Sequence, residues 1–205
     1  MPDLEPAGSS RSDAERNRRM LLDAAAHALA HDPNASMADV ARAAGLARAT
    51  LYRHFQTRQE LLAALRGEAL VRATAAIEAS RPDEGPPLEG LRRTVEALAS
   101  LGVRFRALLL DGADLNEAFL RERDRVLAPL RRVVERGQEA GVIRADVPPQ
   151  WVVTALASLL VAAVRVCPDG TADGRSVADL VYETLARGVV PSSEPPRRSQ
   201  PSQRT

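Results

Sequence analysis

The 205-residue sequence contains no lysine, one cysteine and few aromatic residues. Because lysine is absent, all 28 basic side chains that oppose the 27 acidic ones are arginines. The single cysteine, Cys167, excludes an intramolecular disulfide. Aromatic residues make up 3% of the chain, and runs of β-branched residues are scarce, whereas Ala and Leu are frequent. We therefore expect an all-α protein.

The sequence also lacks a long hydrophobic run. The longest apolar segment, residues 151–164, includes Thr154 and Ser158 and is shorter than the roughly 20 residues that span a bilayer. No charged start followed by an apolar stretch marks a secretory signal. We expect a cytoplasmic protein with no membrane partner, in which residues 151–164 form a buried helix.

Proline, glycine and serine divide the chain into segments. Residues 1–12 and 191–205 have no apolar periodicity, which predicts a disordered N-terminal arm and a disordered C-terminal tail. The sequence RPDEGPP at residues 81–87 is a strong interior break. Apolar residues at spacings of three and four predict helices over about residues 14–30, 37–43, 47–55, 57–80, 88–101, 103–110, 115–125, 126–140, 149–166 and 174–187.

Residues 36–55 predict two short helices joined by a tight turn. Ser36 can cap the first helix, Asp39 lies in its first turn, and Gly45 can adopt the left-handed conformation that ends it. Such a pair is a helix-turn-helix, whose second helix can lie in the DNA major groove. Residues 40–59 contain four arginines and no acid, the charge excess expected of a phosphate-binding surface. A solvated basic face without a partner is the alternative.

The second helix of this pair, residues 47–55, has a core face and a polar face. Leu51 and Phe55 are four residues apart and face the core. A guanidinium can bind guanine through two hydrogen bonds, and hydroxyls and an imidazole can donate to phosphate oxygens. For the tyrosine, partial burial with a wet hydroxyl is the alternative. The groove-competent side chains are Arg48, Thr50, Tyr52, Arg53 and His54.

The segment SMADVARAAGLARATLYRHF at residues 36–55, followed by TRQELL at 57–62, resembles the DNA-binding domain of the TetR family of transcriptional regulators. The resemblance covers about the first quarter of the chain, and residues 141–147 also resemble a turn common before the penultimate helix of many members. It implies phosphate contacts from Thr50, Tyr52, His54 and Arg58. Base or backbone contacts are implied for Arg48, Ala49 and Arg53, and we add Ser36 to the expected DNA-binding residues.

Two positions depart from the family pattern. Family members usually have Ser or Thr where Ala47 stands, so the chain lacks a hydroxyl that would cap the helix and contact phosphate. Met37 and Ala38 replace polar residues that often contact DNA. We therefore expect little direct DNA contact from the start of the first helix of the pair.

The resemblance also implies that the later helices enclose a small-molecule pocket. Large apolar side chains are the expected walls of such a pocket. The candidates are Phe105, Leu109, Phe119 and Trp151.

The last two predicted helices indicate a partner subunit. The helix at 149–166 is apolar nearly all round, and the few remaining elements of one chain cannot cover it. A second copy is the natural cover, so we expect a two-fold homodimer with a four-helix interface. The expected interface residues are Leu159, Val177, Leu180, Val181, Thr184 and Leu185.

These observations predict four regions: the arm over residues 1–12, a helix-turn-helix domain over 13–62, a helical effector-binding and dimerisation domain over 63–190 and the tail over 191–205. The expected function is a sequence-specific repressor that binds a palindromic DNA operator and is released by an unknown small molecule. An architectural DNA-binding protein without an effector is one alternative, although the net charge of +1 is low for that class. A small helical enzyme is another, although the sequence has no nucleophile or phosphate-loop motif. We expect no cofactor and no metal, since no acid or cysteine accompanies His27 and His31 at ligand spacing.

Overall fold

The computed structural model describes residues 7–105, 117–167, 169–172 and 175–190, most of which are α-helical, so the all-α fold class is confirmed. The predicted C-terminal tail and the first six residues lie outside these ranges. A short antiparallel pair of strands, β1 (Thr171–Ala172) and β2 (Arg175–Ser176), precedes the last helix. The helices are α1 (Ala7–His31), α2 (Met37–Ala43), α3 (Arg48–His54), α4 (Arg58–Ala79), α5 (Pro87–Arg104), α7 (Glu117–Val126), α8 (Ala128–Glu139), α9 (Pro149–Val166) and α10 (Val177–Val189).

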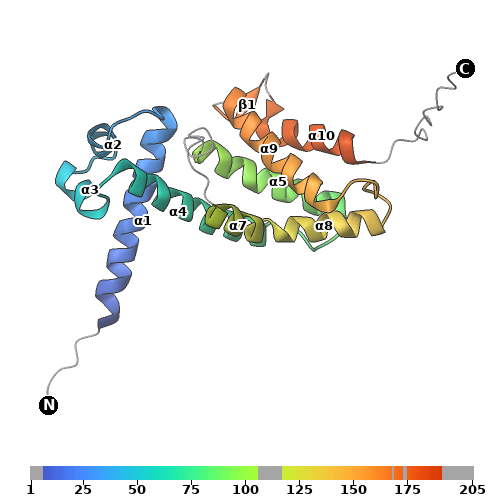
Figure 1. Cartoon of the computed structure of the whole chain (residues 1–205), viewed down its shortest axis with the longest axis horizontal. Helices are drawn as coiled ribbons and strands as arrows, with labels where there is room; N and C mark the ends of the chain where they lie inside the picture. Colours follow the sequence, from blue (N-terminus) through green and yellow to red (C-terminus); the bar gives the residue numbers. More distant parts are fainter. Residues whose placement is uncertain (1–6, 106–116, 168, 173–174, 191–205) are drawn as a thin grey trace, which may run out of the picture.

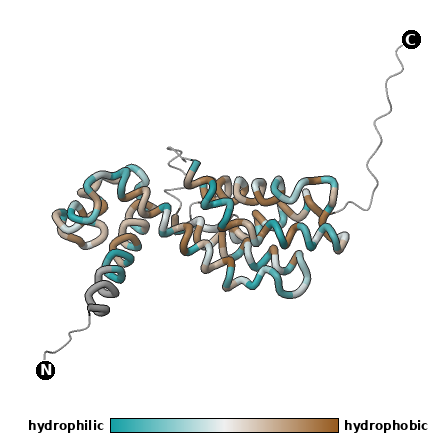
Figure 2. Tube along the Cα trace, turned by 60° about the horizontal axis from the view of Figure 1, so that its bottom comes forward, coloured by the Kyte–Doolittle hydropathy of each residue, from teal (hydrophilic) through white to brown (hydrophobic). Residues whose placement is uncertain are grey.

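These helices form a head and a body that share α4 (Figure 1). The head consists of α1, α2, α3 and the start of α4, and the body of the rest of α4 with α5 and α7–α10. Hydrophobic and hydrophilic residues alternate along the body helices (Figure 2), as expected of helices with one face in a core. The predicted boundary between residues 62 and 63 falls inside α4, which is continuous there.

Each part has its own hydrophobic core. The head core contains Leu22, Leu29, Val40, Leu51, Leu61 and Leu65. The body core contains Ile77, Val95, Leu130, Leu156 and Val181. Fully burying one such side chain stabilises the fold by about 1.5–3 kcal/mol. Leu61 and Leu65 belong to the same helix as Ile77, so α4 contributes to both cores.

Local capping explains where several helices begin. The hydroxyls of Ser36, Thr57 and Ser176 accept hydrogen bonds from the backbone N–H three residues later, at 3.2, 3.1 and 3.0 Å. Helices α5 and α9 begin with proline, which suits the first helical position because its missing N–H is not needed there. At the start of α3, Ala47 provides no side-chain cap.

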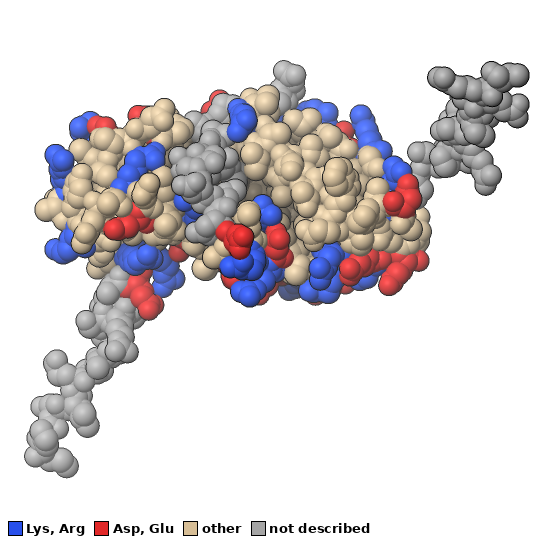
Figure 3. Space-filling view, in the orientation of Figure 1, with Lys and Arg blue, Asp and Glu red and all other residues tan. Residues whose placement is uncertain are grey.

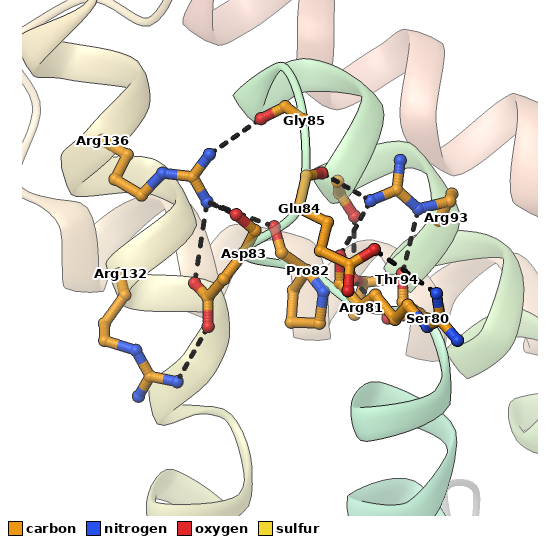
Figure 4. A network of polar contacts seen from close by, with 11 residues as sticks. Ser80, Arg81, Pro82, Asp83, Glu84, Gly85, Arg93, Thr94, Arg132 and Arg136 are labelled. Carbon is orange, nitrogen blue, oxygen red and sulfur yellow. Dashed lines mark hydrogen bonds and ion pairs between the residues drawn. The ribbon is translucent and has the colours of Figure 1, made fainter.

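The break at residues 81–87 is a tightly bound loop between α4 and α5 (Figure 4). From α5, Arg93 donates to the carbonyls of Ser80, Arg81 and Glu84 at 2.8–2.9 Å. From α8, Arg136 donates to the carbonyls of Asp83 and Gly85, each at 2.8 Å. The loop therefore joins three helices of the body firmly.

Three features differ from the sequence prediction. Helix α1 begins at Ala7, within the predicted disordered arm, because no proline after position 6 interrupts the helix before residue 31. Residues 87–104 form one helix where two were predicted, and the rest of the predicted 103–110 helix lies outside the described residues. The strand pair before α10 was not predicted, because two-residue strands leave no periodicity.

Helix α9 is long and apolar enough to cross a membrane by length and composition alone, with a mean hydropathy of 1.5 over 18 residues. Its buried residues Val152, Val153, Leu156, Ala163 and Val164 lie on one side of the helix. Most of them belong to the body core, so this side of α9 packs in the core, whereas 28% of the helix is buried in all and the expected buried helix is confirmed for one side only.

Candidate functional site

Helix α3 presents most of its predicted groove residues to solvent. Leu51 is fully buried and Phe55, which caps the C-terminal end, is 4% exposed, as the helical spacing predicts. Thr50 is half-buried. The exposed side chains are Arg48, Ala49, Tyr52, Arg53 and His54, so one helix brings them together on the outside of the head.

Aromatic rings orient two arginines of the head. The Arg48 guanidinium lies 5.4 Å from the ring centroid of Tyr52, one turn along α3. The Arg18 guanidinium, from α1, lies 5.7 Å from the ring centroid of Phe55. A cation over an aromatic face is held by the negative charge of that face. Sequence reasoning missed Arg18, because nothing in the local pattern connects it with a residue of α3.

Ser36 forms a local cap. Its hydroxyl accepts a hydrogen bond from the Asp39 N–H at 3.2 Å and donates one to the Asp39 carboxylate at 2.6 Å. The hydrogen bond from Ser36 lowers the pKa of Asp39, and the nearby Arg42 guanidinium, 3.0 Å away, adds to this effect. The Ser36 hydroxyl donates and accepts one hydrogen bond within this cap, and its contact with DNA stays a prediction. Met37, one of the two departures from the family pattern, is 8% exposed and belongs to the head core.

Arg58 also has partners within the head. Its Nη2 donates to the Pro33 carbonyl at 2.5 Å, and its Nε lies 3.5 Å from the Ala35 carbonyl. The side chain is half-buried and joins the start of α4 to the loop before α2. Arg58 was predicted to contact phosphate, and in this structure its fork-shaped guanidinium supports the loop, because two loop carbonyls lie within its reach.

The body contains a cavity of about 310 Å³ between α4, α5, α7 and α9. Phe105 and Phe119 line it, together with Ala and Leu side chains of α4 and α5. Polar groups come from Gln150, Thr154 and Ser158 on α9 and from the pair Arg123 and Asp124, whose closest atoms are 2.9 Å apart. Charged Arg66 of α4 completes the polar lining.

One of the predicted pocket residues, Trp151, lies elsewhere, and another is not among the described residues. Trp151 is 65% exposed and does not line the cavity. It precedes the buried pair Val152 and Val153, and this spacing turns its side chain to the outer side of α9. Leu109 lies outside the described residues.

A cluster of ion pairs connects the head to the cavity wall. Asp23 of α1 binds Arg72 of α4 at 2.5 Å and Arg104 of α5 at 2.8 Å, and Arg72 also binds Glu68 at 2.7 Å. Burial alone would lower the pKa of Arg72, but Glu68 and Asp23 more than offset it, so the pKa is raised. The Arg72 guanidinium also lies 6.0 Å from the ring centroid of Phe105. Sequence reasoning missed this cluster, because its members are far apart in the chain.

The predicted dimer residues divide into two groups. Val177, Val181 and Leu185 are only 2–4% exposed and pack in the core of their own chain, so they are unavailable to a partner. They lie on the face of α10 that contacts α5 and α9. Leu159 and Leu180 are half-buried and Thr184 is exposed, so these three lie nearer the surface.

Comparisons with known proteins place this head in a known class. The family model described as "Bacterial regulatory proteins, tetR family" matches residues 21–65, from the middle of α1 into α4. The chain is 32% identical over 181 residues to the HTH-type transcriptional repressor LfrR of Mycolicibacterium smegmatis, an alignment that covers 86% of this chain and 92% of LfrR. The chain belongs to the TetR family.

Other relatives support the family over the same length. The TetR regulator is 27% identical over 186 residues to the HTH-type transcriptional regulator NfxB of Pseudomonas aeruginosa, covering 87% of this chain and 95% of NfxB. Its fold is similar to that of LfrR in complex with proflavine, with a TM-score of 0.68, 29% identity and coverage of 86% of this chain and 99% of LfrR. The regulator PfmR of Thermus thermophilus has a TM-score of 0.65 and the same identity, over 82% and 97% of the two chains.

Membership of the TetR family gives the head its role. This TetR regulator is a DNA-binding transcriptional regulator, and the matched residues 21–65 include all of α2 and α3. Which of the exposed α3 side chains contact bases, and which contact phosphates, stays a prediction.

Proposed function

We propose that the protein is a repressor that binds a palindromic operator as a homodimer and leaves the DNA when a small molecule occupies the cavity. The observation that carries the proposal is the course of α4. Its first turns belong to the head core, its middle lines the cavity with Arg66, Ala69, Leu70 and Ala73, and Ile77 belongs to the body core. A ligand that displaces α4 at the cavity must therefore change the position of the head.

The ion-pair cluster at Asp23 supports this coupling. It joins α1 of the head to α4 and α5, which are two walls of the cavity. Phe105 lines the cavity, contacts Arg72 and belongs to the head core. A ligand that moves Phe105 would disturb the contact that holds Arg72 beside Asp23. An effector acts only if it binds the DNA-bound and the released arrangement of the head with different affinities. This cluster is where the two arrangements of the head would differ.

The lining supports an aromatic, largely apolar ligand. Phe105 and Phe119 offer ring surfaces, and a few polar groups on α9 and α7 can fix the orientation of the ligand. LfrR has been solved in complex with proflavine, a flat aromatic compound. Proflavine is therefore the first probe for this cavity.

The outer faces of α9 and α10 support the homodimer. Trp151 and Val166 are 65% and 76% exposed, and with Ala155, Leu159 and Ala162 they follow one strip of α9. Leu180 and Thr184 lie on the outward side of α10. Exposed apolar side chains that follow one helix face mark an interaction surface. A two-fold dimer would read two half-sites about 34–36 Å apart, or a multiple of that distance.

The test measures how the binding of proflavine changes the affinity of the protein for DNA. The DNA is a duplex selected from a random pool by the protein itself, and its affinity is measured with and without saturating proflavine. We expect proflavine to weaken DNA binding at least fivefold more for the wild-type protein than for the cavity-filled variant described below, a comparison that removes the effect of dye intercalated into the duplex itself. Proflavine that binds by calorimetry and leaves DNA affinity unchanged would refute effector release.

A cavity variant localises the effect. Ala157 lines the cavity, so Ala157→Phe should fill part of it and weaken proflavine binding. Ala140→Phe is the matched control, because Ala140 is exposed at the end of α8 and does not line the cavity. Equal proflavine affinity in both variants would place the ligand elsewhere.

A further inference from the structure

The arginines of this chain differ in whether they are neutralised. Most of those with described side chains bind a carboxylate or a backbone carbonyl, such as Arg92 with Glu96 and Asp179. Within the described part of the chain, five arginines have no ion pair and no hydrogen bond: Arg18, Arg19, Arg48, Arg53 and Arg165. Four of these five belong to the head. Figure 3 shows basic side chains gathered around α3 and on the adjoining part of α1.

Arg48 and Arg53 lie on α3, where DNA contacts are expected, whereas Arg18 and Arg19 lie on α1. Both α1 arginines are exposed. Arg18 is linked to α3 directly, because its guanidinium lies 5.7 Å from the ring centroid of Phe55, the residue that caps the C-terminal end of α3. The side chain is exposed and its N–H groups have no hydrogen-bond partner in the structure, so they are free to bind an anion.

The nearby acids do not neutralise these two arginines. Asp23 lies one helical turn after Arg19, at a spacing that suits an ion pair, but its carboxylate is bound by Arg72 and Arg104. Glu15 lies one turn before Arg19, and the structure pairs it with neither arginine. The ion pairs between head and body thus leave Arg18 exposed beside the end of α3, and Arg19 exposed next to it on α1.

We propose that Arg18 and Arg19 form a second, phosphate-binding part of the DNA interface, which binds the backbone beside the bases that α3 reads. Backbone contacts fix the register of a protein on the duplex, and base contacts specify the sequence. The proposal rests on the DNA binding of the TetR family and is independent of effector release. Its ligand is the sugar-phosphate backbone of double-stranded DNA.

The test measures how affinity depends on salt, because each phosphate contact contributes about 0.9 to the slope of log affinity against log salt. Arg18→Gln, Arg19→Gln and the double variant are compared with wild type on a duplex selected by the wild-type protein and on a scrambled duplex. Arg165→Gln is the matched control, since Arg165 is also exposed and without a partner in the structure but belongs to the last turn of α9, in the body. Circular dichroism confirms that each variant is folded.

We expect each α1 substitution to lower the slope by about 0.9 per bound protomer on both duplexes. Between 50 and 200 mM salt, this corresponds to a roughly 3.5-fold change in the ratio of wild-type to variant affinity for each phosphate that the variant no longer binds. Arg19→Lys should restore the slope, because it restores the charge. The proposal is overturned if folded Arg18→Gln and Arg19→Gln have the same salt slopes as wild type and Arg165→Gln. It is also overturned if the affinity decreases on the selected duplex only, because that result would assign these residues to base recognition.

Discussion

Replacing Ala47 by serine should stabilise the head, because α3 begins without a side-chain cap. Ala47 has an extended backbone conformation, with φ −63° and ψ 135°, close to that of Ser36 at the start of α2. Ser36, Thr57 and Ser176 show the geometry that a serine at position 47 would adopt, with the hydroxyl accepting from the N–H three residues later. At position 47 that donor is the N–H of Thr50, which donates to the Ala47 carbonyl at 2.9 Å and would be shared with the new hydroxyl.

The size of the effect follows from what the new cap can and cannot form. A serine in place of alanine at this position contributes about 0.5–2 kcal/mol. At Ser36 the cap is reciprocal, because Asp39 binds back to the Ser36 N–H. Residue 50 is a threonine and α3 has no acid in its first turn, so only one of the two bonds forms. We therefore expect about 0.5–1 kcal/mol, which raises the melting temperature by about 1–4 °C in a chain of this size.

The assay is chemical and thermal unfolding of wild type, Ala47→Ser and Ala47→Gly, followed by DNA binding. Glycine is nearly as good as serine at this helix position but has no hydroxyl, so it separates stability from phosphate contact. Both variants should be more stable than wild type, and only Ala47→Ser should also bind DNA more tightly. If neither variant gains stability, Ala47 is not the residue that limits α3, and the capping argument fails.

Three further predictions concern the head and the last helix. Arg58→Gln should lower the free energy of unfolding by about 1–3 kcal/mol, without rescue by Arg58→Lys, because one ammonium cannot replace the fork that reaches the loop carbonyls; an unchanged melting curve would contradict this. The pKa of Asp39 is below its ordinary value of 3.8 in the folded protein, so its carboxylate stabilises the fold at neutral pH, and that contribution is lost as the pH falls below 3.8. The stability difference between wild type and Asp39→Asn in urea should therefore shrink with acidification, and a constant difference would disprove the linkage. Val181→Asp should unfold the body, because it buries a charge, whereas Leu180→Asp should leave circular dichroism intact and give monomers by light scattering. A folded dimer of Leu180→Asp would exclude the outer face of α10 as the interface.

The sequence predicted those parts of the molecule in which nearby residues decide the outcome. The helices of the head, the cap at Ser36 and the missing cap at Ala47 all depend on residues within one turn. The exposed face of α3 follows from the spacing of Leu51 and Phe55. These local interactions have the same geometry in every protein, so the pattern of residue types is sufficient.

The sequence could not predict which face of an apolar helix meets its own core. Helices α9 and α10 are apolar on several sides, and Val181 was therefore assigned to a partner although it packs inside the chain. Trp151 was assigned to the cavity for its size, yet its neighbours Val152 and Val153 occupy the inner side of α9. The partners of Arg58 and Asp23 were also missed, because they are far from these residues in the sequence and come close to them only in the folded chain.

Helix α4 is 22 residues long and continuous, with Leu61 and Leu65 anchored at one end and Ile77 at the other. Each residue of an α-helix advances the chain by about 1.5 Å and turns it by about 100°. The direction in which the head faces is therefore set by a count of residues between these anchors. A single residue inserted or deleted between Leu65 and Ile77 would rotate the head by more than a quarter turn relative to the body, even with every contact inside the two cores unchanged. A chimaera with the head of another regulator must preserve that count, because the number of helical residues between the two anchors fixes the orientation of the DNA-binding surface relative to the body.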